Sequence, residues 1–157
     1  MSEYSIYEQL KNNMGLSVRL DDIRRFIGTY FQMYPEILKW REKTVKKARA
    51  RGSIRSVLGR RMEVSDQTKD TSLYNYPIQG TGSDGLKLAL IAFDRRLMDM
   101  DARIVHTHHD EIIVEAKSEI AEEVALLVKD CMEGAFKKLV PDVPFKVEPK
   151  IQGAWGA

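Results

Sequence analysis

Apolar residues recur at helical spacing in five stretches of this chain, and short runs of β-branched residues separate them. The helical spacing predicts helices over about 5–16, 20–34, 37–52, 77–100 and 118–138. Strand-like spacing predicts short strands on either side of Gly59, a hairpin over about 104–114 and a final strand over 145–151. This order of elements predicts an α+β fold in which helices pack on one face of a small antiparallel sheet.

The length and composition allow a compact domain. The chain has 157 residues, 43% of them hydrophobic, which is enough to form a sizeable core and excludes a fully disordered chain. The single Cys131 cannot form an internal disulfide and lies in a helical apolar pattern, which predicts a buried thiol in a reducing compartment. No apolar run approaches the roughly 18 residues of a membrane span, and the N-terminus does not resemble a signal peptide. We therefore expect a soluble, cytoplasmic protein with no membrane partner.

Positive charge is concentrated in one segment. Residues 39–61 contain ten Lys and Arg side chains and a single acid, Glu42, so this segment carries a charge of +9 and the remainder of the chain carries −7. Such a distribution is typical of a phosphate-binding face beside a carboxylate site, and Lys46, Lys47 and Arg49 are its candidate phosphate contacts. A solvated helix face is the alternative interpretation.

The densest chemical signal is the run from His106 to Glu111, which reads His-Thr-His-His-Asp-Glu. If the flanking strands pair, His109 and Asp110 occupy a two-residue turn, where Asn-Gly or Gly-X is preferred. A turn that lacks glycine and places Asp110 beside Glu111 favours a functional site over a purely structural turn. Adjacent carboxylates suit a hard divalent cation, preferably Mg²⁺. A zinc site that uses His106 and His108 is the weaker alternative, because the chain has no second His or Cys cluster.

A polar, glycine-containing block, residues 75–84, stands at the beginning of the long helix expected over 77–100. The side-chain amides of Asn75 and Gln79 can form hydrogen bonds to base edges in a minor groove, and the glycines permit close approach of a ligand to the backbone. By itself this block predicts only a polar helix start.

Three stretches together resemble the C-terminal part of family A DNA polymerases, of the bacterial DNA polymerase I type. The stretches are Tyr34-Pro35 with Gly59-Arg60-Arg61, the block Asn75-Tyr76-Pro77-Ile78-Gln79-Gly80-Thr81, and His109-Asp110-Glu111. The residues themselves, their order and their spacing all agree with the family. The resemblance extends from about residue 1 to residue 155.

The resemblance implies that residues 1–64 are the C-terminal part of the fingers subdomain and residues 65–157 the C-terminal part of the palm. Asp110 matches the family's second metal-binding aspartate, Glu111 its neighbouring acid, and His109 the histidine that meets the primer terminus. Asn75 and Gln79 match residues that touch the minor groove of the primer-template duplex. The implied reaction, used in DNA replication and repair, is transfer of a nucleotide from a dNTP to a primer 3′-hydroxyl with two Mg²⁺ ions.

The chain departs from the family pattern in several places. Thr71 stands where the family usually has an arginine, Thr107-His108 replaces glutamine-valine, and Gly82-Ser83 replaces paired alanines. The 157 residues also contain neither the strand that carries the family's first metal-ligand aspartate nor the helix that grips the incoming nucleotide. We therefore expect a fragment that is inactive alone, either a split-gene product, an expressed piece of a longer protein or a truncated remnant. If the gene is split, its expected partner is an upstream polymerase fragment.

Two other functions are compatible with the same residues. The chain could be a non-catalytic module for duplex-DNA binding or assembly, which is the expectation if no partner supplies the first aspartate. A metal-dependent hydrolase built on His106, His108 and Asp110 is the less favoured alternative, and tight zinc binding would distinguish it.

Overall fold

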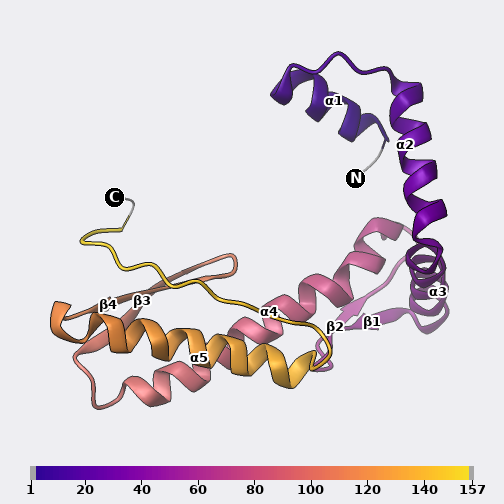
Figure 1. Ribbon diagram of the computed structural model, residues 1–157. Coiled ribbons are helices and arrows are strands. Elements are labelled where there is room, and N and C mark those ends of the chain that lie inside the picture. The colour runs from indigo at the N-terminus through magenta and orange to yellow at the C-terminus, as the bar shows by residue number, and fades with distance from the viewer. Residues whose placement is uncertain (1–2, 156–157) are drawn as a thin grey trace. The chain divides into compact units, whose positions relative to one another are not determined.

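The computed structural model describes residues 3–155. Its elements, in chain order, are α1 (Glu3–Met14), α2 (Leu20–Met33), α3 (Pro35–Arg51), β1 (Ser53–Arg55), β2 (Arg61–Glu63), α4 (Asp70–Leu97), β3 (Ala102–His108), β4 (Glu111–Ala116), the 3-10 turn η1 (Ser118–Ile120) and α5 (Ala121–Leu139) (Figure 1). The strands form two separate two-stranded sheets, β1–β2 and β3–β4. The predicted α+β class is confirmed, with two small sheets in place of one.

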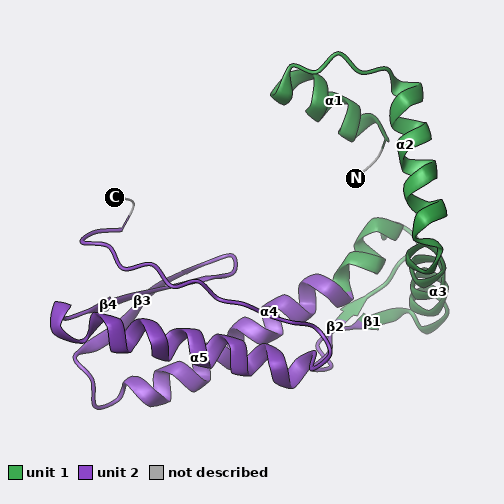
Figure 2. Ribbon diagram, in the orientation of Figure 1, with its two compact units in different colours: residues 1–54, 62–76 green, residues 55–61, 77–157 purple. Residues whose placement is uncertain are grey.

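The chain divides into two compact units (Figure 2). The first comprises Met1–Ile54 and Met62–Tyr76, and the second comprises Arg55–Arg61 and Pro77–Ala157. Within residues 3–155, no helix combines the length and the apolar composition that a membrane span requires.

Local sequence signals set the helix ends in the first unit. Pro35 is the first residue of α3, and α2 ends at Met33, because the residue before a proline disfavours helical backbone. Gly52 ends α3 in a left-handed conformation, with φ of 62°, which glycine adopts without steric cost. The C-terminal ends of α2 and α3 lie within one residue of the predicted positions, whereas α3 begins at Pro35, two residues before its predicted start.

The long helix α4 begins earlier than expected. It was predicted from residue 77, but it begins at Asp70 and contains Pro77 in its interior. Proline removes one backbone hydrogen bond from a helix, at a cost of about 3 kcal/mol. Tertiary packing supports the first two turns, since Leu73 is fully buried and the Arg41 guanidinium lies 4.0 Å from the centre of the Tyr74 ring. The helix therefore continues through the proline.

The core of the second unit lies between α4 and α5. Its buried residues are Ala89, Phe93 and Leu97 on α4, with Val124, Val128, Cys131, Met132 and Ala135 on α5. One face of the β3–β4 hairpin packs against this core through Ala102, Ile104, Ile112, Val114 and Ala116. The arrangement of helices on one face of this sheet and the burial of Cys131 agree with the sequence predictions.

The predicted strand over 145–151 is wrong, because the structure shows no strand there. The segment is held against α5 by side chains: Phe145 stacks on Phe136 at 3.9 Å between ring centres, and the Val147 N–H donates a hydrogen bond to Glu133 at 2.9 Å. The alternation of apolar residues thus reflects packing on a helix, without a partner strand.

Gly85 makes room for the Phe136 ring on the surface of α4. A Cβ atom at position 85 would lie 2.5 Å from the nearest ring atom of Phe136, and the stacked Phe145 limits how far that ring can move. Overpacking costs about 1–3 kcal/mol, whereas replacing a helical glycine with alanine gains about 1 kcal/mol. We therefore expect Gly85→Ala to lower the free energy of unfolding by about 1 kcal/mol, measured by urea denaturation.

The matched control is Gly82→Ala in the same helix, where an added Cβ meets nothing within 4 Å. This variant should gain about 1 kcal/mol from helix propensity alone. Equal effects of the two substitutions would show that the contact with Phe136 does not restrict position 85.

Candidate active site and nucleic-acid interface

The tip of the β3–β4 hairpin carries the predicted site residues. The two strands pair antiparallel with His108 opposite Glu111, which leaves His109 and Asp110 as a two-residue turn, as predicted. His109 has φ of 52° and is the only non-glycine residue with positive φ in the described part of the chain. For an L-residue this left-handed conformation costs roughly 1–2 kcal/mol. The backbone strain therefore lies directly beside the two carboxylates.

A β-bulge determines which side chains of β3 face the core. Ile104 pairs with Val114 and His106 pairs with Ile113, so Val105 is an extra residue in β3. The extra residue shifts the alternation of side chains by one position. Ile104 consequently packs on the core, while His106 and His108 are exposed and lie on the opposite face.

The exposed face of the hairpin holds a row of aromatic rings. The His108 ring lies 4.3 Å from that of His109 and 6.5 Å from that of His106, and His106 contacts Trp155 at 5.3 Å. His106 and His108 thus share a face, as the zinc alternative requires. However, residues 3–155 contain no group of three or more His, Cys, Asp or Glu side chains that could hold a metal ion. Among these residues, His106, His108 and Asp110 are therefore not grouped as the three protein ligands of a catalytic zinc site.

Asp110 and Glu111 are both exposed at the tip, and neither forms an ion pair with another described residue. Their oxygen atoms are the donor type that Mg²⁺ prefers, and Mg²⁺ commonly binds one or two carboxylates together with waters and phosphates. Asp110 and Glu111 therefore offer the type of ligand atom that Mg²⁺ binds. A two-metal site needs further ligands in addition to this pair.

Asn75 and Gln79 lie on exposed positions of α4, one helical turn apart. The polar block that contains them was expected at the beginning of a helix, but it lies inside α4. The Thr81 hydroxyl donates a hydrogen bond to the Pro77 carbonyl at 2.6 Å. The helical spacing presents both amide side chains on the same side of the helix.

The three basic residues singled out on α3 differ in their surroundings. Lys46 and Lys47 are exposed and make no ion pair with any residue between 3 and 155. Arg49 instead pairs with Asp70 at 2.5 Å and donates a hydrogen bond to the Thr68 carbonyl at 2.9 Å. Arg49 therefore connects α3 to the residues that begin α4, in addition to carrying charge on this helix.

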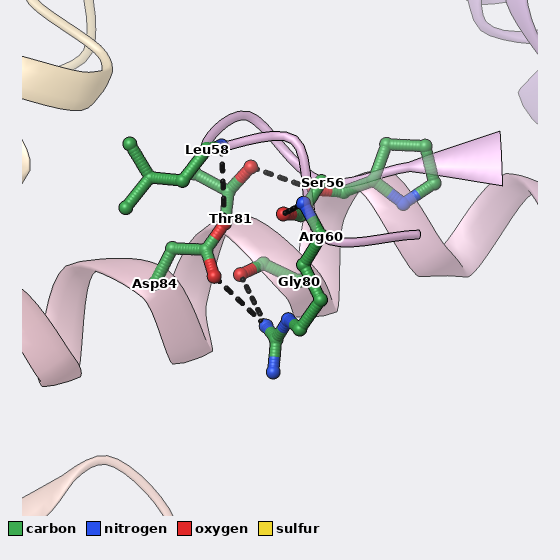
Figure 3. A network of polar contacts seen from close by, with 7 residues as sticks. Ser56, Leu58, Arg60, Gly80, Thr81 and Asp84 are labelled. Carbon is green, nitrogen blue, oxygen red and sulfur yellow. Dashed lines mark hydrogen bonds and ion pairs between the residues drawn. The ribbon is translucent and has the colours of Figure 1, made fainter. Parts of the chain in front are cut away.

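A polar network in the second unit was not anticipated from the sequence. Figure 3 shows the buried carboxylate of Asp84 on α4 beneath the loop that joins β1 to β2. It accepts hydrogen bonds from the Arg60 guanidinium at 2.9 Å and from the Leu58 N–H at 3.2 Å, and it also hydrogen-bonds with the Ser56 side chain. The network joins residues 24 to 28 positions apart, which local periodicity does not reveal.

Burial and hydrogen bonding act in opposite directions on Asp84. Burial alone raises the pKa of this carboxyl, but hydrogen bonds from Ser56 and Leu58, together with the charge of Arg60, outweigh it and hold the pKa below its usual value. Asp84 is therefore ionised at neutral pH, and its charge is matched by Arg60. One sequence feature could have indicated the pairing of Arg60 with Asp84. Asp84 is the single acid within residues 75–90, downstream of the Gly59-Arg60-Arg61 turn.

Known proteins resemble this chain over most of its length. The model of DNA polymerase family A matches residues 2–157. The thermostable DNA polymerase I of Thermus aquaticus is 36% identical over 149 residues, which cover 89% of this chain and 18% of that protein. DNA polymerase I of Aquifex aeolicus is 34% identical over 159 residues, which cover 99% of this chain and 27% of that protein.

A solved structure agrees with these sequence matches. It is the POL domain of Pol1 from M. smegmatis in complex with DNA primer-template and dNTP, with a TM-score of 0.72 and 27% sequence identity. The match covers 85% of this chain and 24% of the M. smegmatis chain. The chain thus spans about a quarter or less of the length of these similar proteins.

Proposed function

Since the chain belongs to DNA polymerase family A, we propose that it forms the C-terminal part of a template-directed DNA polymerase. Residues 1–64 form the end of the fingers, and residues 65–157 form the end of the palm. The substrates of the complete enzyme are a primer-template duplex and a dNTP. We also propose a cytoplasmic location, where these substrates occur.

The observation that carries the proposal is the hairpin tip, where a strained turn exposes Asp110 beside Glu111. In the proposed reaction the primer 3′-hydroxyl attacks the α-phosphate of the dNTP, a new phosphodiester bond forms, and pyrophosphate leaves. Mg²⁺, when bound, supplies activation of the hydroxyl and stabilisation of charge on the leaving oxygens. Asp110 holds the metal, Glu111 acts as an outer or occasional ligand, and His109 orients the primer terminus.

Asn75 and Gln79 are the proposed contacts to the minor groove. Purine N3 and pyrimidine O2 are acceptors at similar positions in every Watson-Crick pair, so amide donors can contact the duplex without reading its sequence. The exposure of both residues on one side of α4 supports this role. Such contacts favour a correctly paired primer end over a mismatched one.

Two carboxylates on one turn do not complete a two-metal site. The proposal therefore requires another carboxylate from polymerase sequence that is not among these 157 residues. If no such segment joins it, the second candidate function applies, namely duplex binding without catalysis. The exposed lysines Lys46 and Lys47 support this candidate, because contacts to phosphates need no metal.

The proposed DNA contacts on α3 predict a salt-dependent affinity. Each phosphate contact contributes a slope of about −0.9 to log affinity against log salt concentration. The double variant Lys46→Gln with Lys47→Gln should therefore flatten the slope by up to about 1.8 and weaken binding to all duplex sequences alike. The measurement is fluorescence anisotropy of a labelled primer-template at several salt concentrations.

The matched control replaces the adjacent lysines Lys137 and Lys138, exposed in the last turn of α5, with Gln. It removes the same charge from another helix and should leave the slope nearly unchanged. Arg49 is not substituted, because its ion pair with Asp70 connects two helices. Equal slopes for the two double variants would show that Lys46 and Lys47 belong to a solvated face.

A further inference from the structure

The loop between β1 and β2, residues 56–60, exposes two adjacent apolar side chains. Val57 is 49% exposed and Leu58 is 54% exposed. Single exposed apolar residues are common on protein surfaces, but this pair stands in a very basic setting. Residues 55–61 contain Arg55, Arg60 and Arg61 and no acid. Arg60 is paired with Asp84, so the loop combines apolar surface at its tip with the positive charge of the exposed Arg55.

The conformation of this loop is fixed from within. The Ser56 N–H donates to the Arg60 carbonyl at 2.9 Å, and the Gly59 N–H donates to the Ser56 carbonyl at 3.0 Å. The Arg55 guanidinium donates to the Gly59 carbonyl at 2.8 Å. Gly59 has φ of 86°, which a residue with a side chain rarely adopts. These bonds close a tight turn with the apolar side chains on its outside.

The loop is also fastened to α4 by the buried carboxylate of Asp84 (Figure 3). Only 4% of this residue is exposed, and it accepts hydrogen bonds from the Leu58 N–H and from Arg60. Burial of a carboxylate is unfavourable unless donors compensate it. The fold thus uses a buried charge to hold Leu58 in one exposed position.

The position of the loop relates it to the proposed DNA interface. The Arg60 guanidinium donates a second hydrogen bond to the Gly80 carbonyl at 3.2 Å. Gly80 directly follows Gln79, one of the proposed minor-groove contacts on α4. The loop therefore lies beside the part of α4 that we propose to meet the duplex.

We infer that the loop of residues 56–60 is an additional contact to duplex DNA, in which the Leu58 side chain lies against sugars and base edges of the minor groove. Arg55, which is exposed and forms no ion pair with another described residue, provides charge complementarity to the phosphates. Apolar side chains combined with arginines are a recurrent way to bind this groove. The inference rests on the proposed polymerase function and adds a contact that is apolar, and hence insensitive to salt, to the ionic contacts of α3.

The first test is Leu58→Ser in the full chain, with a labelled primer-template as the probe. Loss of an apolar contact of this size should weaken binding roughly three- to tenfold. The dependence of affinity on salt should stay unchanged, because no charge is removed. The matched control is Leu126→Ser on α5, where the leucine is 64% exposed and lies outside the loop. This control should bind DNA as the original chain does.

The second test is Asp84→Asn. The change in net charge and the loss of a contact that positions the loop predict opposite changes in DNA affinity for this variant. Removal of a negative charge strengthens DNA binding if only the net charge matters. If Asp84 positions Leu58, the affinity falls and the Leu58 amide exchanges its hydrogen faster, because that amide donates to the carboxylate. Ser56→Ala is the milder variant of the same network and should shift both readouts in the same direction, even if Asp84→Asn reduces folding.

The possible outcomes separate this inference from the proposed function. Unchanged affinity of Leu58→Ser, in a chain that binds duplex with the expected salt slope, overturns the loop contact and leaves the polymerase proposal standing. Stronger binding by Asp84→Asn also overturns the positioning role of Asp84. Failure of the original chain to bind any duplex contradicts the proposed function itself.

Discussion

Replacing Asp110 with Asn is expected to lower the rate of nucleotide incorporation by roughly 10³-fold or more. The substitution keeps the size of the side chain and its suitability for a turn, but it removes the charge that the proposed metal site needs. A suitable enzyme is a chimera in which this chain replaces the matching segment of the Aquifex aeolicus polymerase. The measurement is single-turnover incorporation, and duplex affinity should stay within a few-fold.

The stability of the isolated chain should change little in the same variant, and it can rise. Asp110 is exposed, and it forms no ion pair with the other described residues. The two neighbouring acids repel each other when no cation is bound, so removing one charge relieves repulsion. Thermal unfolding with and without Mg²⁺ measures this effect.

Two control variants complete this experiment. Glu111→Gln should reduce incorporation less than Asp110→Asn does, since Glu111 is the proposed outer ligand. Asp94→Asn removes an exposed charge from α4 and should leave incorporation unchanged. An Asp110→Asn enzyme that loses several kcal/mol of stability and still incorporates nucleotides would show that Asp110 holds the turn together and has no catalytic role.

The hairpin tip could be predicted from sequence because its signals are local. β-branched runs flank the His109-Asp110 pair, and the structure shows the two-residue turn that this pattern predicts. The bulge at Val105 could not be predicted in this way, because alternation alone places Ile104 and His106 on one face. Packing of Ile104 against the core of α4 and α5 decides which face each side chain takes.

The errors in the predicted fold arose where tertiary contacts outweigh local preference. Pro77 indicated a helix start, but burial of Leu73 extends α4 in the N-terminal direction. Phe145 belongs to an alternating pattern that indicated a strand, but it stacks on Phe136 of α5. The partnership of Arg60 with Asp84 spans 24 residues and depends on the loop folding back onto α4. Such contacts have no fixed sequence spacing.

We expect this chain to contribute a carboxylate pair to a polymerase whose catalytic site also needs residues from outside it. The most direct test is incorporation of one labelled dNTP on a primer-template, with Mg²⁺, by the purified 157-residue chain and by the Aquifex aeolicus chimera. We expect no extension by the chain alone, extension by the chimera, and loss of that extension in the Asp110→Asn chimera. Extension by the homogeneous chain alone would contradict the account, as would a folded, duplex-binding chimera that incorporates no nucleotide.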